Sequence, residues 1–256
     1  MIQSDLNAIY VVVARELIKF VRERGRLVST LARPIIWLFL VGGGMSRVVS
    51  PAMGVPYMQF IFPGIIGMTI LFSSIFSSIS IIWDKEFGFM KEMLAAPISR
   101  SSIVVGKALS GTAVSSIQAL LIVLLFPLLG LKLGPLQIIL VLCISMLLAF
   151  CLSSLGILIA SFYESFESFS VIINFIVMPM FFLSGAMYPV KLLPHVLGIF
   201  TRINPLTYGI DALKYMIFPM STLIAHDFPL GLDIAVIASS SIVFVIISAN
   251  VFERRK

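Results

Sequence analysis

The feature that most constrains this chain is a series of long apolar stretches without charged residues. Each could hold a helix that crosses a bilayer, which needs about 20 mostly apolar residues. Asp, Glu, Lys and Arg are absent from residues 48–83, 108–131, 133–163, 168–190 and 234–252. Hydrophobic residues make up 59% of the chain and charged residues 12%, against roughly 45–50% and 25% in soluble domains. These values exclude a soluble globular fold and predict an all-α integral membrane protein.

Together with a shorter stretch before them, the apolar segments predict six transmembrane helices in a single domain over residues 1–256. The shorter stretch, 34–46, extends back to Leu27 if the Arg33 side chain reaches toward the lipid headgroups. The predicted spans cover residues 27–48, 58–82, 106–129, 135–161, 168–189 and 231–252.

The distribution of Lys and Arg favours an even number of spans. With six spans and both termini in the cytoplasm, 13 of the 18 basic residues lie on the inner side, as expected for cytoplasmic loops. The connection 163–168 departs from this pattern, because it is acidic. The segment 192–215 is interrupted by Pro194, Arg202 and Pro205, and its apolar pieces are too short to span. We therefore predict an outer re-entrant segment there, and a multi-pass protein of the inner or plasma membrane.

Residues 1–26 are typical of an amphipathic helix that lies in the inner membrane interface. One side is apolar at helical spacing, and carries Leu6, Ile9, Tyr10, Val13, Leu17, Phe20 and Val21. The other side is basic and carries Arg15, Lys19, Arg22 and Arg26. Cations on this face are attracted to anionic headgroups, so membrane lipids are expected partners. A simple anchor and a helix that also contacts a cytoplasmic partner are both compatible with this pattern.

A charged connection, residues 84–100, follows the second predicted span on the cytoplasmic side. Six of the 18 residues from Trp83 to Arg100 are charged. If residues 84–96 are helical and Pro97 ends the helix, side chains three to four positions apart share one face. That face would be an apolar ridge of Phe87, Met90 and Leu94. Such a ridge could fit a groove in another protein, and an ordinary loop is the alternative.

Motifs for catalysis and metal binding are missing from the sequence. Gly106 and Lys107 are reminiscent of a phosphate-binding loop, but Ala108 stands where Ser or Thr is required. The two histidines have no metal-ligand spacing, and neither lies in a predicted span to serve as a base for an intramembrane serine nucleophile. We predict that the chain is not an enzyme and binds no metal or cofactor. The net charge of +6 is attributed to the membrane topology, not to nucleic acid.

Polar side chains within and beside the spans are mild. Serines 73, 74, 77, 78 and 80 let helices approach closely. No charged residue lies near the middle of a predicted span, which argues against a proton- or sodium-coupled transporter. Four side chains could line a pathway for a transported molecule or could instead bond to neighbouring helices. They are Gln118, Asn174, Ser184 and Tyr188.

Three groups of motifs together resemble a known family. They are Phe62-Pro63-Gly64-Ile65-Ile66 at the second span, Asp84-Lys85-Glu86-Phe87-Gly88 with Pro97-Ile98-Ser99-Arg100 and Gly106-Lys107, and Phe182-Leu183-Ser184-Gly185 with Tyr188-Pro189 and Asn204-Pro205-Leu206-Thr207-Tyr208. With the six-span layout, they resemble the membrane subunit of ABC transporters of the type-2 exporter family. This group includes drug, lipid-linked polysaccharide and nodulation-factor exporters.

The resemblance implies a permease that pairs with a second permease subunit and two separate ATPase subunits, which bind ATP and Mg²⁺. It places a coupling helix in the 84–100 connection, docked on the ATPase, with Glu86 as its acidic residue. The N-terminal helix would contact the side of the same ATPase. Asn204, Pro205 and Tyr208 would belong to the outer re-entrant helices. The implied ATPase-coupling residues are Asp84, Lys85, Glu86, Phe87, Gly88, Met90, Lys91, Glu92, Leu94 and Arg100.

The resemblance leaves the substrate open. Aromatic residues are scattered without the alignment expected of a glycan channel, so a drug- or lipid-like amphiphile is preferred. The alternatives are a polysaccharide or glycolipid exporter of the same family and, in a different class, a non-enzymatic scaffold or passive channel. A homodimer and a heterodimer fit the sequence equally well.

Overall fold

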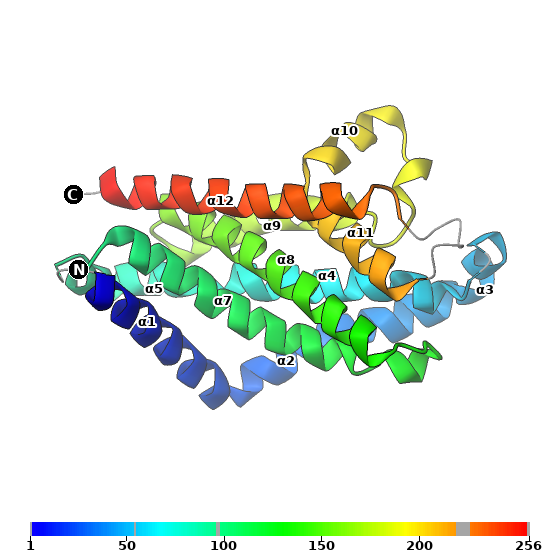
Figure 1. The fold of residues 1–256 in the computed structure, drawn as a ribbon, viewed down its shortest axis with the longest axis horizontal. Helices are drawn as coiled ribbons and strands as arrows, with labels where there is room; N and C mark the ends of the chain where they lie inside the picture. The colour runs from blue at the N-terminus through cyan, green and yellow to red at the C-terminus, as the bar shows by residue number, and fades with distance from the viewer. Residues whose placement is uncertain (1, 54, 96–97, 219–225, 255–256) are drawn as a thin grey trace.

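The computed structural model describes residues 2–53, 55–95, 98–218 and 226–254, and within these ranges it is helical and contains no β-strand (Figure 1). Its α-helices are α1 (Ile2–Arg22), α2 (Arg24–Ile36), α3 (Gly42–Met53), α4 (Tyr57–Ser77), α5 (Ile79–Glu86), α6 (Phe89–Ala95), α7 (Arg100–Val123), α8 (Pro135–Phe162), α9 (Phe166–Phe182), α10 (His195–Ile203), α11 (Pro205–Ile217) and α12 (Leu230–Arg254). A π-helical turn, η1 (Trp37–Val41), joins α2 to α3, and 3₁₀ turns lie at η2 (Phe126–Leu129) and η3 (Val190–Leu192). The predicted all-α fold is confirmed.

Among the described residues, five helical stretches are long and apolar enough to cross a membrane. They are Thr30–Val48, Tyr57–Glu86, Arg100–Val123, Pro135–Phe162 and Leu230–Phe252. These coincide with the first four predicted spans and the last one. The remaining predicted span, 168–189, corresponds to α9, which has only 17 residues, the lower limit for a spanning helix. The count of six spans therefore stays a prediction.

The helix α4 forms the centre of the bundle and is buried along nearly its whole length. It packs against α7 and α8, which also pack against each other, while α12 covers α8 and α11. Small side chains allow these close crossings. Ser74 Oγ on α4 donates a hydrogen bond to Ser115 Oγ on α7 at 2.9 Å, and Ser153 on α8 fits against the bare backbone of Gly111.

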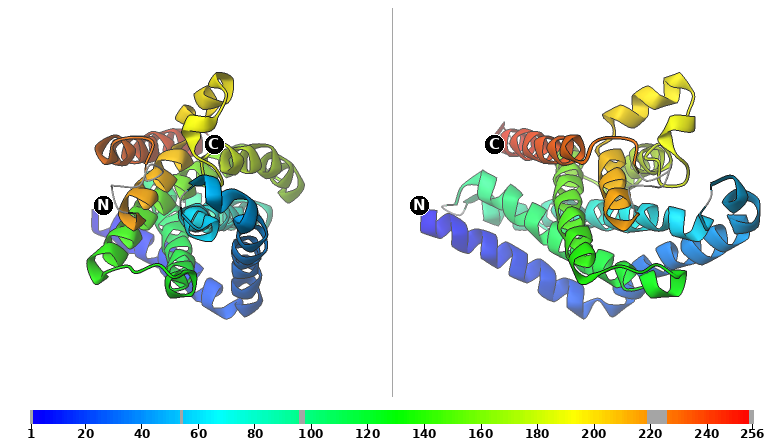
Figure 2. Two further views of the ribbon diagram at one scale, coloured as in Figure 1. Left: turned by 90° about the vertical axis from the view of Figure 1, so that its right-hand side faces the viewer. Right: turned by 45° about the vertical axis from the view of Figure 1, so that its right-hand side comes forward.

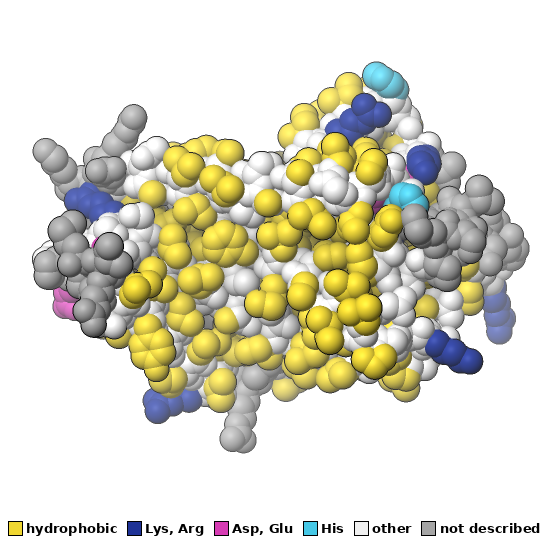
Figure 3. Space-filling view, in the orientation of Figure 1, with side chains coloured by type: hydrophobic (Ala, Val, Ile, Leu, Met, Phe, Trp, Pro, Cys, Tyr) yellow, Lys and Arg dark blue, Asp and Glu magenta, His cyan; other side chains and the backbone are white. Residues whose placement is uncertain are grey.

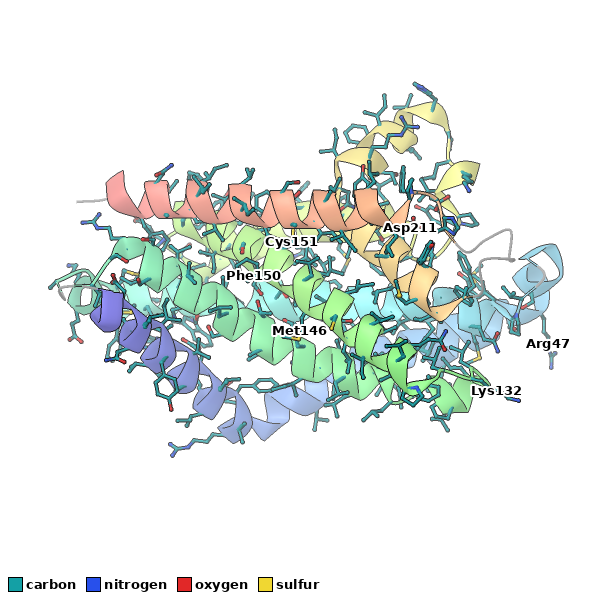
Figure 4. All side chains as sticks on the ribbon, in the orientation of Figure 1. Arg47, Lys132, Met146, Phe150, Cys151 and Asp211 are labelled. Atoms are coloured by element: carbon teal, nitrogen blue, oxygen red, sulfur yellow. The ribbon has the colours of Figure 1, made fainter. Side chains whose placement is uncertain are left out.

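Both termini lie at the same end of the elongated bundle, called the N/C end below (Figures 1 and 2). The connection between α5 and α6 and the start of α7 lie at this end, whereas α3, α10 and α11 lie toward the opposite end. In the six-span topology, Arg47 at the end of the first span and Lys132 after the third belong to the outer side, and both are labelled at that opposite end in Figure 4. Having both termini at one end is what an even number of crossings produces.

The surface between the two ends is apolar. Figure 3 shows hydrophobic side chains over the middle of the visible face, with Lys and Arg gathered toward its margins. Large apolar residues on α9 and α12, such as Phe175 and Ile242, are exposed. An apolar surface of this extent is unfavourable in water and is expected where a protein faces lipid or another subunit.

The helix expected over residues 84–96 is interrupted. Because Gly88 adopts a left-handed conformation with φ of +83°, which glycine accepts without steric strain, α5 ends at Glu86 and α6 starts at Phe89. Phe87 is 72% exposed and Met90 is buried. The predicted continuous apolar ridge is therefore wrong for these two residues. The side chain of Leu94, its third member, and Pro97 lie outside the described residues.

Candidate functional site

The N-terminal helix α1 packs along α7, and the close contact depends on a glycine, Gly106. A Cβ atom on Gly106 would lie 3.2 Å from Val12 Cβ and 3.4 Å from Ile9 Cα. Val12 and Phe20 are buried, one and three turns along α1 from Ile9. Glycine at position 106 thus lets the two helix backbones approach closely.

This packing places part of α1 in the bundle. Phe20, expected on the apolar face toward the membrane, is buried together with Val12, whereas Leu6, Tyr10 and Val21 of that face are exposed. Contact of this face with lipid stays a prediction. The basic face is also not wholly turned to headgroups: Arg15 bonds to α5, and Lys19 Nζ lies 4.3 Å from the centre of the Trp83 ring. Arg22 is exposed, and the side chain of Arg26 lies outside the described residues. Helical spacing alone could not reveal that charged residues of α5 and α7 attract this face.

A buried ion cluster joins α1, α5 and α7. Lys107 Nζ lies 2.5 Å from Asp84 Oδ2, 2.8 Å from Glu16 Oε1 and 3.0 Å from Ser80 Oγ. Arg15 Nη2 donates to Asp84 Oδ1 at 3.1 Å and Oδ2 at 3.0 Å, and to Glu16 Oε1 at 3.1 Å. Two cations are therefore matched by two carboxylates, and three helices are held together at one point.

Burial makes this charge balance important. The side chain of Lys107 is 2% exposed, and those of Glu16 and Asp84 are 11% and 10% exposed. Burial alone would raise the pKa of Glu16, but Lys107 and Arg15 outweigh it and hold that pKa below its ordinary value. A buried ion that loses its partner is strongly destabilising, so the four residues depend on one another.

The next residue after Asp84 fixes α5 to a different helix. Lys85 Nζ donates hydrogen bonds to the carbonyl oxygens of Ala160 at 2.9 Å, Ser161 at 3.1 Å and Tyr163 at 2.9 Å. These carbonyls form the C-terminal end of α8, where backbone acceptors lack helical partners and the helix dipole favours a cation. Lys85 therefore caps α8.

The start of α7 is tied to two further helices at the N/C end. Asp5 Oδ1 on α1 accepts a hydrogen bond from the backbone N–H of Ser99 at 2.8 Å, and this bond lowers the pKa of Asp5. Arg100 Nη1 donates to the carbonyl oxygen of Phe252, near the end of α12, at 2.7 Å. Arg100, predicted to be an ATPase-coupling residue, thus contacts the bundle.

Beyond these anchored residues the connection becomes exposed. Glu86, Phe87, Phe89, Lys91 and Glu92 all lie at the surface. A hollow of about 380 Å³ lies beside them, lined by Lys85, Glu86, Met90, Lys91 and Glu164. The predicted coupling residues therefore differ in position: Asp84, Lys85 and Arg100 bond to the bundle, whereas Glu86, Phe87, Lys91 and Glu92 are exposed. Met90 is buried, and the side chain of Leu94 lies outside the described residues.

The predicted pathway residues are not gathered in one place. Gln118 on α7 is buried, and its Oε1 has no hydrogen-bond partner within the described residues. Asn174 is exposed and donates to Ser170 O of its own helix at 3.1 Å. Ser184 Oγ donates to Phe181 O at 2.5 Å, and Tyr188 Oη donates to Phe182 O. A role for these residues in a pathway stays a prediction.

The segment 192–215 forms two short helices, α10 and α11, joined at Asn204. Asn204 Oδ1 accepts from Leu206 N at 3.1 Å and caps α11, whereas its Nδ2 donates to Met180 O on α9 at 2.7 Å. Pro205 is the first residue of α11, where a proline fits a helix well. Tyr208 Oη donates to Arg202 O at 2.8 Å. Asn204, Pro205 and Tyr208 thus stabilise the joint between α10 and α11.

Sequence reasoning missed a second charged cluster, at the start of α12. Asp211 accepts hydrogen bonds from the backbone N–H groups of Asp227, at 2.8 and 3.0 Å, and of Phe228, at 2.8 Å. Burial raises the pKa of Asp211 even though these bonds oppose the shift. Figure 4 labels Asp211 where α11 meets the start of α12. One turn on, fully buried Lys214 donates to Gly185 O at 2.7 Å.

The comparison with known proteins identifies the family. The sequence model of the ABC-2 type transporter family matches residues 7–218. The chain belongs to the ABC-2 type transporter family. It is a transport permease of that family, a group of ABC-transporter subunits that lack an ATPase site of their own. Several apolar helices agree with a multi-pass membrane protein.

Relatives of the permease family cover most of the chain. The transport permease ycf38 of Cyanophora paradoxa is 30% identical over 215 residues, which is 82% of this chain and 74% of that protein. The inner membrane transport permease YadH of Escherichia coli K12 is 26% identical over 250 residues, 94% of this chain and 93% of its own length. Nodulation protein J of Rhizobium meliloti is 25% identical over 244 residues, 90% and 86% of the two chains.

Proposed function

We propose that this chain is the membrane-spanning subunit of an ATP-driven exporter and works with a second permease subunit and two separate ATPases. The N/C end is the cytoplasmic side in this proposal, so both termini are cytoplasmic and α10 and α11 are the outer re-entrant helices. The ATPases bind ATP and Mg²⁺. The six-span topology and the direction of transport belong to the same proposal.

The observation that carries the proposal is the division of residues 84–92 into an anchored and an exposed part. Asp84 and Lys85 are fixed to α1, α7 and α8 by ion pairs and hydrogen bonds. Directly after them, Glu86 and Phe87 are exposed, and Gly88 turns the chain into α6. A partner that grips the exposed part can thus move three helices of the bundle through two adjacent residues.

The exposed part has the chemistry of a docking surface. Phe87 and Phe89 supply apolar area, while Glu86, Lys91 and Glu92 supply charges of both signs. Aromatic side chains, phenylalanine included, are enriched at protein interfaces, and charges contribute orientation and specificity. Closure of the ATPases upon ATP binding would pull on α6 and, through Asp84 and Lys85, on α1, α7 and α8.

The same ion cluster gives the N-terminal helix a part in this coupling. Arg15 and Glu16 of α1 bond to the residues that anchor α5, so α1 and the exposed connection form one unit at the N/C end. We propose that the ATPase contacts both. The substrate we propose is a drug- or lipid-like amphiphile, which enters from the membrane or its inner surface.

The experiment is a charge reversal on the exposed connection. Glu86→Lys should abolish or strongly reduce co-purification of the ATPase and ATP-dependent transport in vesicles, while the permease itself stays folded. Glu167→Lys is the matched control. Glu167 is also an exposed glutamate, and it lies in the first turn of α9, outside the connection between α5 and α7. If the Glu86→Lys protein keeps both ATPase association and transport, the assignment of this connection as the coupling element is wrong.

A further inference from the structure

A cavity of about 320 Å³ lies between α2, α4, α5 and α7, near the junction of α1 and α2. This is the lower end of the size range of small-molecule sites in proteins. Much of its wall is apolar and aromatic, with Phe72 and Phe76 on α4 and Trp83 on α5. The ion cluster, the exposed connection and the charged cluster at α12 do not include these residues.

Two buried polar atoms in the cavity wall have no partner among the described residues. Ser73 Oγ and Gln118 Oε1 make no hydrogen bond within the described residues, although the two residues are only 4% and 2% exposed. Thr69, one helical turn before Ser73 on the same wall, instead donates its hydroxyl to Ile65 O at 2.8 Å. Buried polar groups normally have a hydrogen-bond partner, so Ser73 and Gln118 could bond to a ligand in the cavity.

The cavity also has a charged side. Arg33 and Glu23 both line it, and the Arg33 guanidinium lies 4.9 Å from the centre of the Phe72 ring. The N–H groups of a guanidinium lie in its plane, so stacking on an aromatic ring does not cover them. This planar fork of donors matches a carboxylate or phosphate. Arg33 is exposed whereas Ser73 and Gln118 are buried, so the charged and the unpartnered neutral groups are at different depths.

We propose that this cavity binds one amphiphile that carries an acidic group, paired with Arg33, and a hydroxyl group, bonded to Ser73 and Gln118. The apolar body of the ligand lies against Phe72, Phe76 and Trp83. This inference rests on the proposed function and deepens it, because such a molecule would be the class of substrate that the permease moves.

Direct binding tests this proposal without ATP or transport. Trp83 lines the cavity, and the chain has only two tryptophans, so Trp37→Phe leaves Trp83 as the single tryptophan reporter. The full-length chain in phosphatidylcholine nanodiscs is titrated with 12-hydroxydodecanoate, with dodecanoate, which lacks the hydroxyl, and with 1,12-dodecanediol, which lacks the charge. We expect saturable changes in Trp83 emission and the order hydroxy acid tighter than dodecanoate, with dodecanediol weakest.

The variants separate the two contacts. Arg33→Gln should weaken both acids at least tenfold. Ser73→Ala and Gln118→Leu should remove the preference for the hydroxy acid while dodecanoate still binds, which also shows that these proteins are folded. The matched control is Ser74→Ala, because Ser74 is buried next to Ser73 but bonds to Ser115 instead.

Several results would overturn the proposal. They are no saturable signal with either acid, unchanged affinity in Arg33→Gln, tighter binding of dodecanediol than of the acids, or equal loss in Ser74→Ala and Ser73→Ala. Failure here is distinguishable from failure of the coupling proposal. The Glu86→Lys protein should bind 12-hydroxydodecanoate like the parent even when it no longer retains an ATPase. If the parent protein binds neither acid but still co-purifies with the ATPase, only the binding proposal is refuted.

Discussion

Replacing Lys107 by methionine tests whether the buried ion cluster holds the N-terminal helix in place. Methionine keeps most of the side-chain length and removes the cation. The substitution leaves Glu16 and Asp84 with Arg15 as their remaining cation, and it removes three contacts of 2.5 to 3.0 Å. One of the two carboxylates is then buried without a matching charge.

The size of the effect follows from burial. Removing one partner of a buried ion pair costs about 3–5 kcal/mol. The carboxylates here are about one tenth exposed, and Arg15, which is 43% exposed, still bonds to Asp84, so we expect the lower end of that range, about 3 kcal/mol. Adding Glu16→Gln to Lys107→Met restores one cation to one carboxylate. The double variant should therefore recover about 1–2 kcal/mol, within the usual range for residues in direct contact.

The assay is equilibrium unfolding in mixed micelles with increasing SDS, read by circular dichroism. Hydrogen exchange of the α1 backbone, measured on the same samples, should show earlier loss of protection in Lys107→Met than in the parent. Lys132→Met is the matched control, because Lys132 lies at the opposite end of the bundle (Figure 4). A change below about 0.5 kcal/mol in Lys107→Met, or a double variant less stable than Lys107→Met, would refute the reasoning.

Three further predictions concern packing, capping and pH. Gly106→Val should loosen α1 and cost about 1–3 kcal/mol, because Val12 Cβ already lies 3.2 Å from an added Cβ; proteolysis near α1 measures it. Asp211→Ala should destabilise by about 1–3 kcal/mol by leaving the Asp227 and Phe228 N–H groups without an acceptor, and Asp211→Asn, which keeps one oxygen acceptor, should lose less; thermal unfolding compares them. The pKa of Glu16 is lowered in the folded state, so its stabilisation is present above its ordinary pKa, about 4.3, and is lost as pH falls below that value. Protection of α1 should fall in that pH window, and it should fall less in Glu16→Gln than in the parent, because Asp5, whose pKa is also lowered, still titrates in the variant.

The spans could be predicted from the sequence because they depend on composition along the chain. The predicted 135–161 corresponds to α8, Pro135–Phe162, and the predicted 231–252 to α12, Leu230–Arg254. Hydrocarbon thickness fixes the length of such segments whatever their neighbours are. The fifth predicted span differs because α9 ends at Phe182, after which Gly185 takes a left-handed conformation with φ of +73°.

The ion cluster could not be predicted in the same way, because its members are far apart in sequence. Arg15 and Asp84 are separated by 69 positions, and Lys107 and Glu16 by 91. Each residue alone looked like part of a solvated or headgroup-facing surface. One local signal was available in Gly106. A glycine lets a neighbouring helix approach α7 closely, and that helix would then cover the adjacent Lys107 side chain.

Adjacent positions on one helical turn explain how a short connection can act on several spans. Successive residues of an α-helix point about 100° apart, so Asp84 and Lys85 face different neighbours although their backbones are linked by a single peptide bond. Asp84 bonds to Lys107 of α7 and Arg15 of α1, and Lys85 bonds to the end of α8. A turn of helix is stiff because each backbone bond restrains its neighbours. In the proposed coupling, a force on the exposed residues after Glu86 should therefore move α7 and α8 together, and breaking either attachment should separate the motions of these two helices.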